Sequence, residues 1–201
     1  MIRDEDRYWG AQGTRAAIVA NALSVIGVEA GDPKTRPILE ELLGPVKGKW
    51  DLDRPFRIVA GANGAQVTQG ISTCGLVAEG LWRRAAIDAQ WLYAPYVIGS
   101  AVSRAIAFAK THKAWNTVAS NGRPQSGDYV VLGTGLSTHA LTAVGWEGDT
   151  LISVDGGQVS SDGLQSIRRC CRTWSIAKKS LVGWVDVDKL PIRSDRSRYG
   201  V

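Results

Sequence analysis

The hydrophobic pattern of the chain changes its period near Gly127, and this change limits the fold more than any other feature of the sequence. Upstream of it, apolar side chains recur at the spacing of a helix face, whereas downstream of it strand-like runs lie between glycine-rich turns. A helical part followed by an antiparallel sheet in one core predicts the α+β class. We expect helices over 15–26, 37–43, 74–86 and 98–111, a short strand over 56–60, and later strands over 129–132, 138–146, 150–155, 167–174 and 181–187.

The chain is long enough to bury one substantial core. It has 201 residues, of which 44% are hydrophobic, and it shows no internal repeat. Chains of this size most often form one domain. We therefore expect a single domain over residues 1–192, with extra helices at its N-terminal end, and a flexible basic tail over residues 193–201.

Cys74 is expected in the first turn of the helix over 74–86, because Ser72 and Thr73 before it are helix-capping residue types. The partial positive charge at a helix N-terminus lowers the pKa of a thiol, and the free N–H groups of the first turn can hold a developing oxyanion. The placement indicates a nucleophilic cysteine. The alternative is that Cys74 is a small core residue, since free cysteine is among the most buried residue types.

A cysteine nucleophile needs a general base, and the chain has only two histidines, His112 and His139. His139 opens the strand over 138–146 after a flexible loop, so its side chain can reach the rim of the sheet. A surface histidine at a strand end is the other interpretation. His112 ends the helix over 98–111, where a cation is favoured, and we expect it to be a solvent-facing cap.

A third group should orient the imidazole, and the length of the loop after Trp146 decides which residue does so. If residues 147–149 form a three-residue loop, Asp155 lies diagonal to His139 on the same sheet face. If the loop has two residues, His139 faces Gln158 instead. We favour Asp155, because an anion better stabilises the imidazolium. The other interpretation of Asp155 is that it starts a turn before two glycines.

Four segments follow one another along the chain: Ser72-Thr73-Cys74-Gly75-Leu76-Val77, Ser126-Gly127-Asp128-Tyr129-Val130-Val131-Leu132, Thr138-His139-Ala140-Leu141 and Val154-Asp155-Gly156-Gly157. Together they resemble the NlpC-like and CHAP families of papain-fold peptidases. Those families have a helix-borne Cys, a Gly-Asp that opens the first core strand, a His at the start of the next strand and a polar third residue one strand later. The resemblance covers about residues 70–157, and the order of the segments is more specific than any one of them.

The resemblance implies a papain-like core, in which the helix bearing Cys74 packs on an antiparallel sheet. It also implies a hydrolase without a cofactor that cuts peptide or amide bonds in the peptide stems of peptidoglycan. The chain departs from the family pattern at two positions. The NlpC-like motif usually has Asp before the Cys and Ser after it, whereas this chain has Thr73 and Gly75. Papain-like enzymes often place a Gln oxyanion donor just upstream, and Gln69 and Gln66 are the candidates here.

Composition excludes several other classes. The net charge of +5 and pI of about 9.3 favour anionic partners, but the 24 Lys and Arg residues are scattered, so we expect no nucleic-acid binding. Three cysteines, two of them the adjacent Cys170 and Cys171, indicate no disulfide framework. We expect these two to point to opposite faces of the strand over 167–174, with at least one buried. Two histidines without zinc-ligand spacing predict no metal site.

The first seven residues carry acids, so we expect neither a signal peptide nor a membrane span. A wall-cutting enzyme of this kind would then leave the cell by phage lysis or a specialised secretion machine, and an immunity partner would accompany a delivered effector. Two rival functions stay open. One is a non-catalytic virion or interaction protein on the same fold, and the other is a cysteine deamidase or peptidase toxin that acts on a protein.

Overall fold

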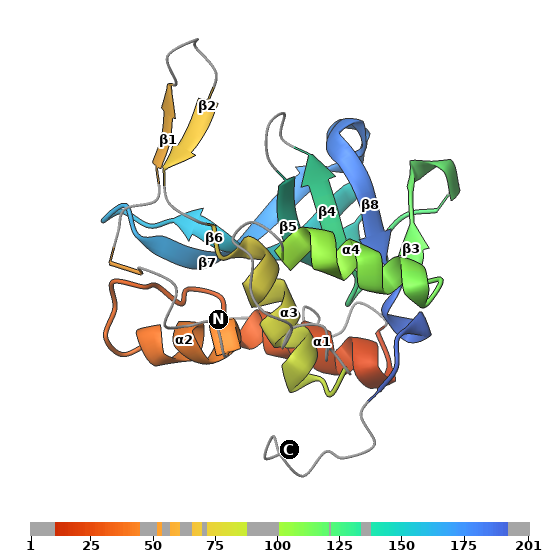
Figure 1. Ribbon diagram of the computed structural model, residues 1–201, viewed down its shortest axis with the longest axis horizontal. Coiled ribbons are helices and arrows are strands. Elements are labelled where there is room, and N and C mark those ends of the chain that lie inside the picture. Colours follow the sequence, from red (N-terminus) through yellow and green to blue (C-terminus); the bar gives the residue numbers. More distant parts are fainter. Residues whose placement is uncertain are drawn as a thin grey trace.

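The computed structural model describes residues 11–44, 52–53, 57–60, 66–69, 72–87, 101–120, 122–133 and 138–192, with the backbone alone at 57–60, 66–69 and Ser120. Within these residues the protein is α+β, with helices and a six-stranded antiparallel sheet, as the change of period predicted (Figure 1). The strand order in the sheet is β3-β8-β4-β5-β6-β7, and β1 and β2 form a separate two-stranded sheet. The N-terminal half supplies the helical layer and the C-terminal half supplies most of the large sheet.

The helices and strands follow the predicted order. The helices are α1 (Gly13–Ser24), α2 (Arg36–Leu43), α3 (Cys74–Arg84), α4 (Ala101–Thr111) and the short α5 (Trp174–Ala177). The strands are β1 (Arg57–Ala60), β2 (Gln66–Gln69), β3 (Trp115–Asn116), β4 (Tyr129–Gly133), β5 (Thr138–Glu147), β6 (Thr150–Val159), β7 (Gln165–Thr173) and β8 (Leu181–Val185).

The structure differs from the prediction in three additional short elements and in the bounds of α1 and β6. Strands β2 and β3 and helix α5 were not expected from the pattern, since each is only a few residues long. Helix α1 begins at Gly13, two residues before its expected start at position 15. Strand β6 continues to Val159, four residues past its expected end. The expected tail over 193–201 lies outside the described residues.

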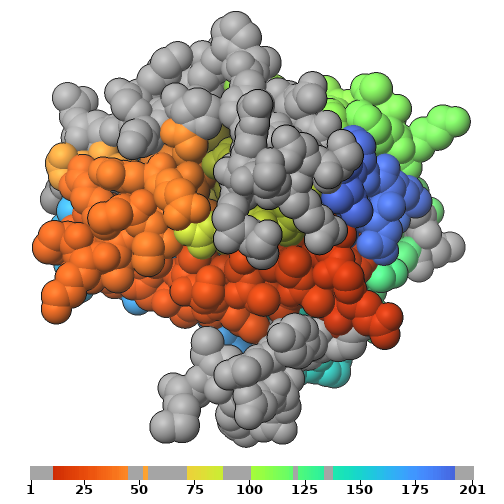
Figure 2. Space-filling view, turned by 90° about the horizontal axis from the view of Figure 1, so that it is seen from below, coloured from red at the N-terminus to blue at the C-terminus, as the bar shows by residue number. Residues whose placement is uncertain are grey.

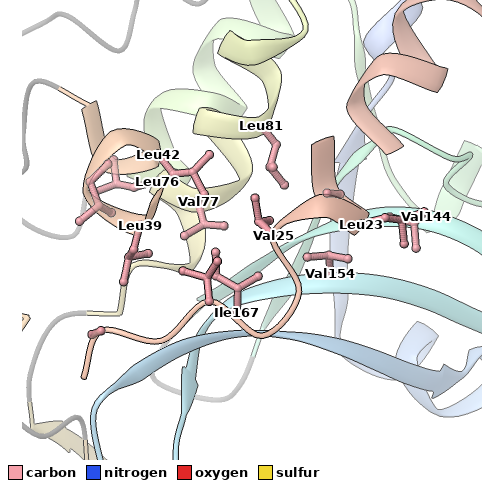
Figure 3. Packing of buried hydrophobic residues seen from close by; sticks show 14 of the residues in the cluster. Leu23, Val25, Leu39, Leu42, Leu76, Val77, Leu81, Val144, Val154 and Ile167 are labelled. Atoms are coloured by element: carbon pink, nitrogen blue, oxygen red, sulfur yellow. The ribbon is translucent and has the colours of Figure 1, made fainter. Parts of the chain in front are cut away.

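Helix α3 lies at the centre of the molecule. Its residues from Cys74 to Arg83 are all buried, which a helix can achieve only when neighbours cover every side. Leu76, Val77 and Leu81 pack among residues of α1, α2 and the sheet, such as Leu42, Val154 and Ile167 (Figure 3). Its other side, with Cys74, Ala78 and Trp82, packs in a second cluster that includes Tyr129 of β4 and Val102 of α4.

The surface of the helical layer is formed by α1 and α2. Seen from below, these two helices make a continuous face, and part of α3 is visible beside them (Figure 2). On the sheet, a third apolar cluster contains Val130 and Leu132, which alternate with the Tyr129 and Val131 side chains of the second cluster. No helix in the described ranges is long and apolar enough to cross a membrane.

The adjacent cysteines of β7 differ from expectation. Cys170 is partly buried and Cys171 is exposed, so the prediction that at least one is buried is wrong. The two do alternate, but β7 is the edge strand of the sheet, and from Arg168 onward its side chains are only partly buried or exposed. A period-2 pattern predicts which residues share a face and not whether anything covers that face.

Candidate active site

Cys74 is the first residue of α3, as the capping pattern predicted, and only 5% of its surface is exposed. The cap differs from the expected one, because Thr73 makes no side-chain cap hydrogen bond. Instead, the Thr73 N–H donates to the Gln165 side-chain oxygen at 2.8 Å, and the Cys74 N–H donates to the Ser72 hydroxyl at 3.3 Å. These contacts hold the first turn of α3 against β7 and fix the position of the thiol.

His139 is the second residue of β5, and the structure brings it to both other members of the candidate triad. Its Nε2 lies 2.6 Å from Oδ2 of Asp155, and its ring lies within hydrogen-bonding reach of the Cys74 thiol, which raises the pKa of His139. Because Nε2 is engaged by Asp155, Nδ1 is the nitrogen that remains for the thiol. His112, by contrast, follows α4 and donates to the Phe108 carbonyl at 3.0 Å, so it caps that helix and stays away from the site.

The electrostatics of the pair favour its charged form. Burial raises the pKa of the Cys74 thiol, but the hydrogen bond to His139 and the positive charge of that ring outweigh burial, and the pKa is lowered. Burial lowers the pKa of His139, but its hydrogen bonds to Asp155 and Cys74 raise that pKa to about 9. Both shifts favour a thiolate–imidazolium ion pair over the neutral thiol and imidazole, and this ion pair is the reactive state of a cysteine nucleophile.

Asp155 is fully buried and is held by donors on two sides. Besides His139, it accepts from the Ser153 hydroxyl at 2.6 Å and from both Nη atoms of Arg172, at 2.5 and 3.2 Å. Arg172 Nη1 also donates to the Ser153 oxygen at 2.7 Å. Burial raises the pKa of Asp155, yet the bonds and charges of His139 and Arg172 outweigh it and lower the pKa, so the carboxylate stays ionised.

Sequence reasoning missed Ser153 and Arg172. A period of 2 places Ser153 on the same face as Asp155, so that serine could have been found. Arg172 stands opposite Leu151 of β6, and this pairing depends on a register between β6 and β7 that no local pattern specifies.

The β5–β6 hairpin explains why Asp155, and not Gln158, reaches His139. Glu147 pairs with Thr150, so the loop has two residues, and the prediction of a three-residue loop is wrong. The first of them, Gly148, has φ +58°, as a tight hairpin turn of type II′ requires. Taken alone, this turn would have placed Gln158 opposite His139.

A β-bulge restores the other register. The pairing shifts between Ala143 and Gly145, so that Thr142 pairs with Val154 as a three-residue loop would have set it. Asp155 thereby comes to His139. Gln158 lies past a second register shift, where it pairs with Ser166 of β7.

Asp155 does not start a turn, because the Asp-Gly-Gly segment runs inside β6. A Cβ on Gly156 would lie 2.6 Å from Cβ of Val77, and one on Gly157, whose φ is +66°, would overlap the Ser72 hydroxyl and lie 3.1 Å from the Cys74 nitrogen. Only glycine allows β6 to pass this close to the start of α3. The segment thus supplies the partner of His139 and seats the cysteine helix.

Gly75 is one of the two departures from the family pattern, and Gln69 is one of the two expected oxyanion donors. A Cβ on Gly75 would lie 3.1 Å from both the Tyr129 hydroxyl and Cβ of Ala101, so a serine here would need its neighbours to shift. The backbone of Gln69 ends β2, but its side chain lies outside the described part of the chain. Its expected role as an oxyanion donor stays a prediction.

Behind Cys74, α3 buries a second acid, Glu79, which the sequence analysis did not single out. It is fully buried, and its carboxyl oxygens have no hydrogen-bond partner among the described residues. Burial raises the pKa of Glu79 well above its ordinary value, although the nearby charges of Arg104 and Arg83 lower it. Burial therefore favours the uncharged form of this carboxyl.

No group of three or more His, Cys, Asp or Glu side chains that could hold a metal ion occurs within the residues that the structure describes. What the site offers is a preformed nucleophile, a protonated imidazole beside it and a buried carboxylate. This arrangement can perform acyl transfer through a covalent thioester.

No protein-family model matches the chain, and no curated protein matches its sequence. Among solved structures, the chain is similar to the crystal structure of Ly7917, with a TM-score of 0.38 and 14% identity. It is also similar to the crystal structure of Ly7917 with the hydrolyzing product of MDP, with a TM-score of 0.36 and 14% identity. The matches cover 85% and 86% of this chain but only 61% and 62% of the other, so the chain spans about three fifths of their length. Similarity at this level carries no argument about function.

Proposed function

We propose that the protein is a cysteine hydrolase that cleaves peptide or amide bonds, with a papain-like core of the NlpC/CHAP type and the peptide stems of peptidoglycan as its substrate. The observation that carries the chemistry is the buried contact of Cys74, His139 and Asp155, with the thiol pKa lowered and the imidazole pKa raised. The substrate class rests on the resemblance in sequence.

The first half of the reaction forms a thioester. The Cys74 thiolate attacks the amide carbonyl carbon, and the carbonyl oxygen becomes an oxyanion beside the backbone N–H of Cys74. His139, which is protonated in the resting pair, gives its proton to the leaving nitrogen. The C–N bond then breaks, the amine departs and the acyl group stays on sulfur.

The second half restores the enzyme. Neutral His139 takes a proton from water while the water oxygen attacks the thioester, and the carboxylic acid leaves as the C–S bond breaks. The products are thus one acid and one amine for each amide and water consumed. Asp155 keeps the imidazole oriented throughout and stabilises its charged form in the resting enzyme.

The test is incubation of the protein with purified peptidoglycan, followed by mass spectrometry for fragments with new amine ends. We expect such fragments with the wild type, and none with Cys74→Ala. Cys171→Ala is the matched control, because Cys171 is exposed on an edge strand and should keep full activity. Fragments that form equally with Cys74→Ala would contradict the proposal.

A cysteine deamidase or peptidase that acts on a protein would use the same site, and only the substrate separates it from the wall enzyme. A non-catalytic binding protein is disfavoured by the site itself. Cys74 and Asp155 are buried and His139 and Arg172 are partly buried, and burying charged groups in one row costs folding energy that an interaction domain does not need.

A further inference from the structure

Ser72 contacts the nucleophile in two ways that the mechanism above leaves unused. Its hydroxyl oxygen accepts from the Cys74 backbone N–H at 3.3 Å. The same hydroxyl lies within hydrogen-bonding reach of the Cys74 thiol and helps to lower its pKa. The side chain is half-buried at the start of α3 and lies beside the reacting sulfur.

A hydroxyl can donate one hydrogen bond and accept others at the same time. In the resting pair it donates to the thiolate and accepts from the Cys74 N–H. When sulfur attacks a carbonyl, its negative charge moves to the carbonyl oxygen, and the thioether-like sulfur becomes a poor acceptor. The hydroxyl hydrogen then loses its partner at the moment when an oxyanion forms next to the Cys74 N–H.

The position of this hydroxyl is built into the fold. A Cβ on Gly157 would overlap Oγ of Ser72, so β6 must carry glycine at the point where it passes this oxygen. The Gly157 φ of +66° belongs to the left-handed region, and a side chain there would be both strained and in collision with the hydroxyl. Because β6 has glycine at this position, the space beside the start of α3 stays open for Oγ of Ser72.

We propose that Ser72 is a catalytic residue of this site, the side-chain donor that turns from the Cys74 thiolate to the oxyanion during acyl transfer. The proposal rests on the acyl-transfer chemistry of the proposed function but not on the choice of peptidoglycan. It assigns to Ser72 the role for which the sequence offered Gln69.

Two reactions of Cys74 separate this role from simple support of the thiolate. Alkylation by iodoacetamide needs the thiolate but forms no oxyanion, whereas acylation by p-nitrophenyl acetate passes through one. Both rates would be measured in protein with Cys170→Ala and Cys171→Ala, where Cys74 is the remaining thiol. Mass spectrometry follows alkylation, and the burst of nitrophenolate follows acylation.

In this background Ser72→Ala should slow acylation on the order of 100-fold, as the loss of an oxyanion donor does. Alkylation should stay within about threefold, because His139 remains to stabilise the thiolate. Ser72→Thr keeps the hydroxyl and should recover most of the acylation rate. Thermal unfolding of each variant confirms that the comparison is made between folded proteins.

Equal losses in the two reactions, or none in acylation, would overturn the role of Ser72. If the parent protein is alkylated at Cys74 but never acylated, acyl transfer itself is wrong, and this inference is wrong with it. If it is acylated but leaves peptidoglycan intact, only the substrate in the proposed function is wrong.

Discussion

Replacement of Asp155 by Asn directly tests the row of alternating charges formed by Cys74, His139, Asp155 and Arg172. Asp155 accepts from His139, Ser153 and Arg172, and none of its surface is exposed. An Asn keeps the shape but has one accepting oxygen, and its NH2 group would face N–H donors. The change therefore removes the anion and leaves a buried donor without an acceptor.

Two magnitudes follow from the structure. The rise of the His139 pKa from its ordinary value near 6.5 to about 9 corresponds to about 3 kcal/mol in favour of the imidazolium, shared between Asp155 and Cys74. Without Asp155 we expect the pKa of His139 to fall by about one to two units. Loss of one partner of a buried ion pair costs about 3–5 kcal/mol, and the 23% exposure of the Arg172 side chain argues for the lower end.

The assay is hydrolysis of peptidoglycan as a function of pH, with urea unfolding measured in parallel. In the wild type, activity should decline at alkaline pH as His139 loses its proton near pH 9. In Asp155→Asn this decline should begin about one to two pH units lower, and the loss of imidazolium alone should reduce the rate near pH 8 about two- to tenfold. Gln158→Ala is the control and should leave the profile unchanged. An alkaline limb that stays in place or moves upward would refute the reasoning.

Three further predictions use the same protein. Cys74→Ala, His139→Ala and the double variant should lose nearly the same hydrolytic activity, because nucleophile and base act as a unit; losses that add up would contradict the pairing. In the folded wild type at pH 7, iodoacetamide should label Cys74 faster than Cys170, whose thiol pKa burial and the nearby Asp155 carboxylate raise to about 11; peptide mass spectrometry decides, and faster labelling of Cys170 would count against the thiolate. Glu79→Gln should unfold at nearly the wild-type urea concentration below pH 4.5 and should become the more stable protein as pH rises above it. The reason is that the carboxyl of Glu79 ionises in the unfolded chain above pH 4.5 but stays protonated in the fold, so the free energy of unfolding of the wild type falls as pH rises. A wild type whose stability relative to Glu79→Gln does not fall with pH would show that Glu79 is charged in the fold.

Local patterns predicted the parts of this molecule that local forces determine. The helix that starts at Cys74 and the strand that His139 opens were both expected, because capping residues and apolar periodicity act over a few positions. The α+β class followed from the same periods. None of this needed knowledge of which strands pair.

The sequence could not reveal what depends on pairing at a distance. The two-residue turn at Gly148 and the bulge at Val144 each shift the register by one residue, and their effects cancel, so Asp155 reaches His139 although the loop is one residue shorter than expected. Arg172 reaches Asp155 through the β6–β7 register, and Ser72 meets Gly157 across two elements far apart in the chain. Such contacts form only once the whole sheet has its register.

The row of thiolate, imidazolium, carboxylate and guanidinium alternates in sign and sums to zero. Because neighbouring charges in the row are opposite, their electrostatic potentials cancel within a few ångströms of the site. These four groups then neither attract nor repel a charged molecule at a distance. An anionic polymer would instead be attracted by the positive charge elsewhere on the chain, whose net charge is +5. Added salt should therefore slow the encounter with such a polymer while leaving the chemical step almost untouched.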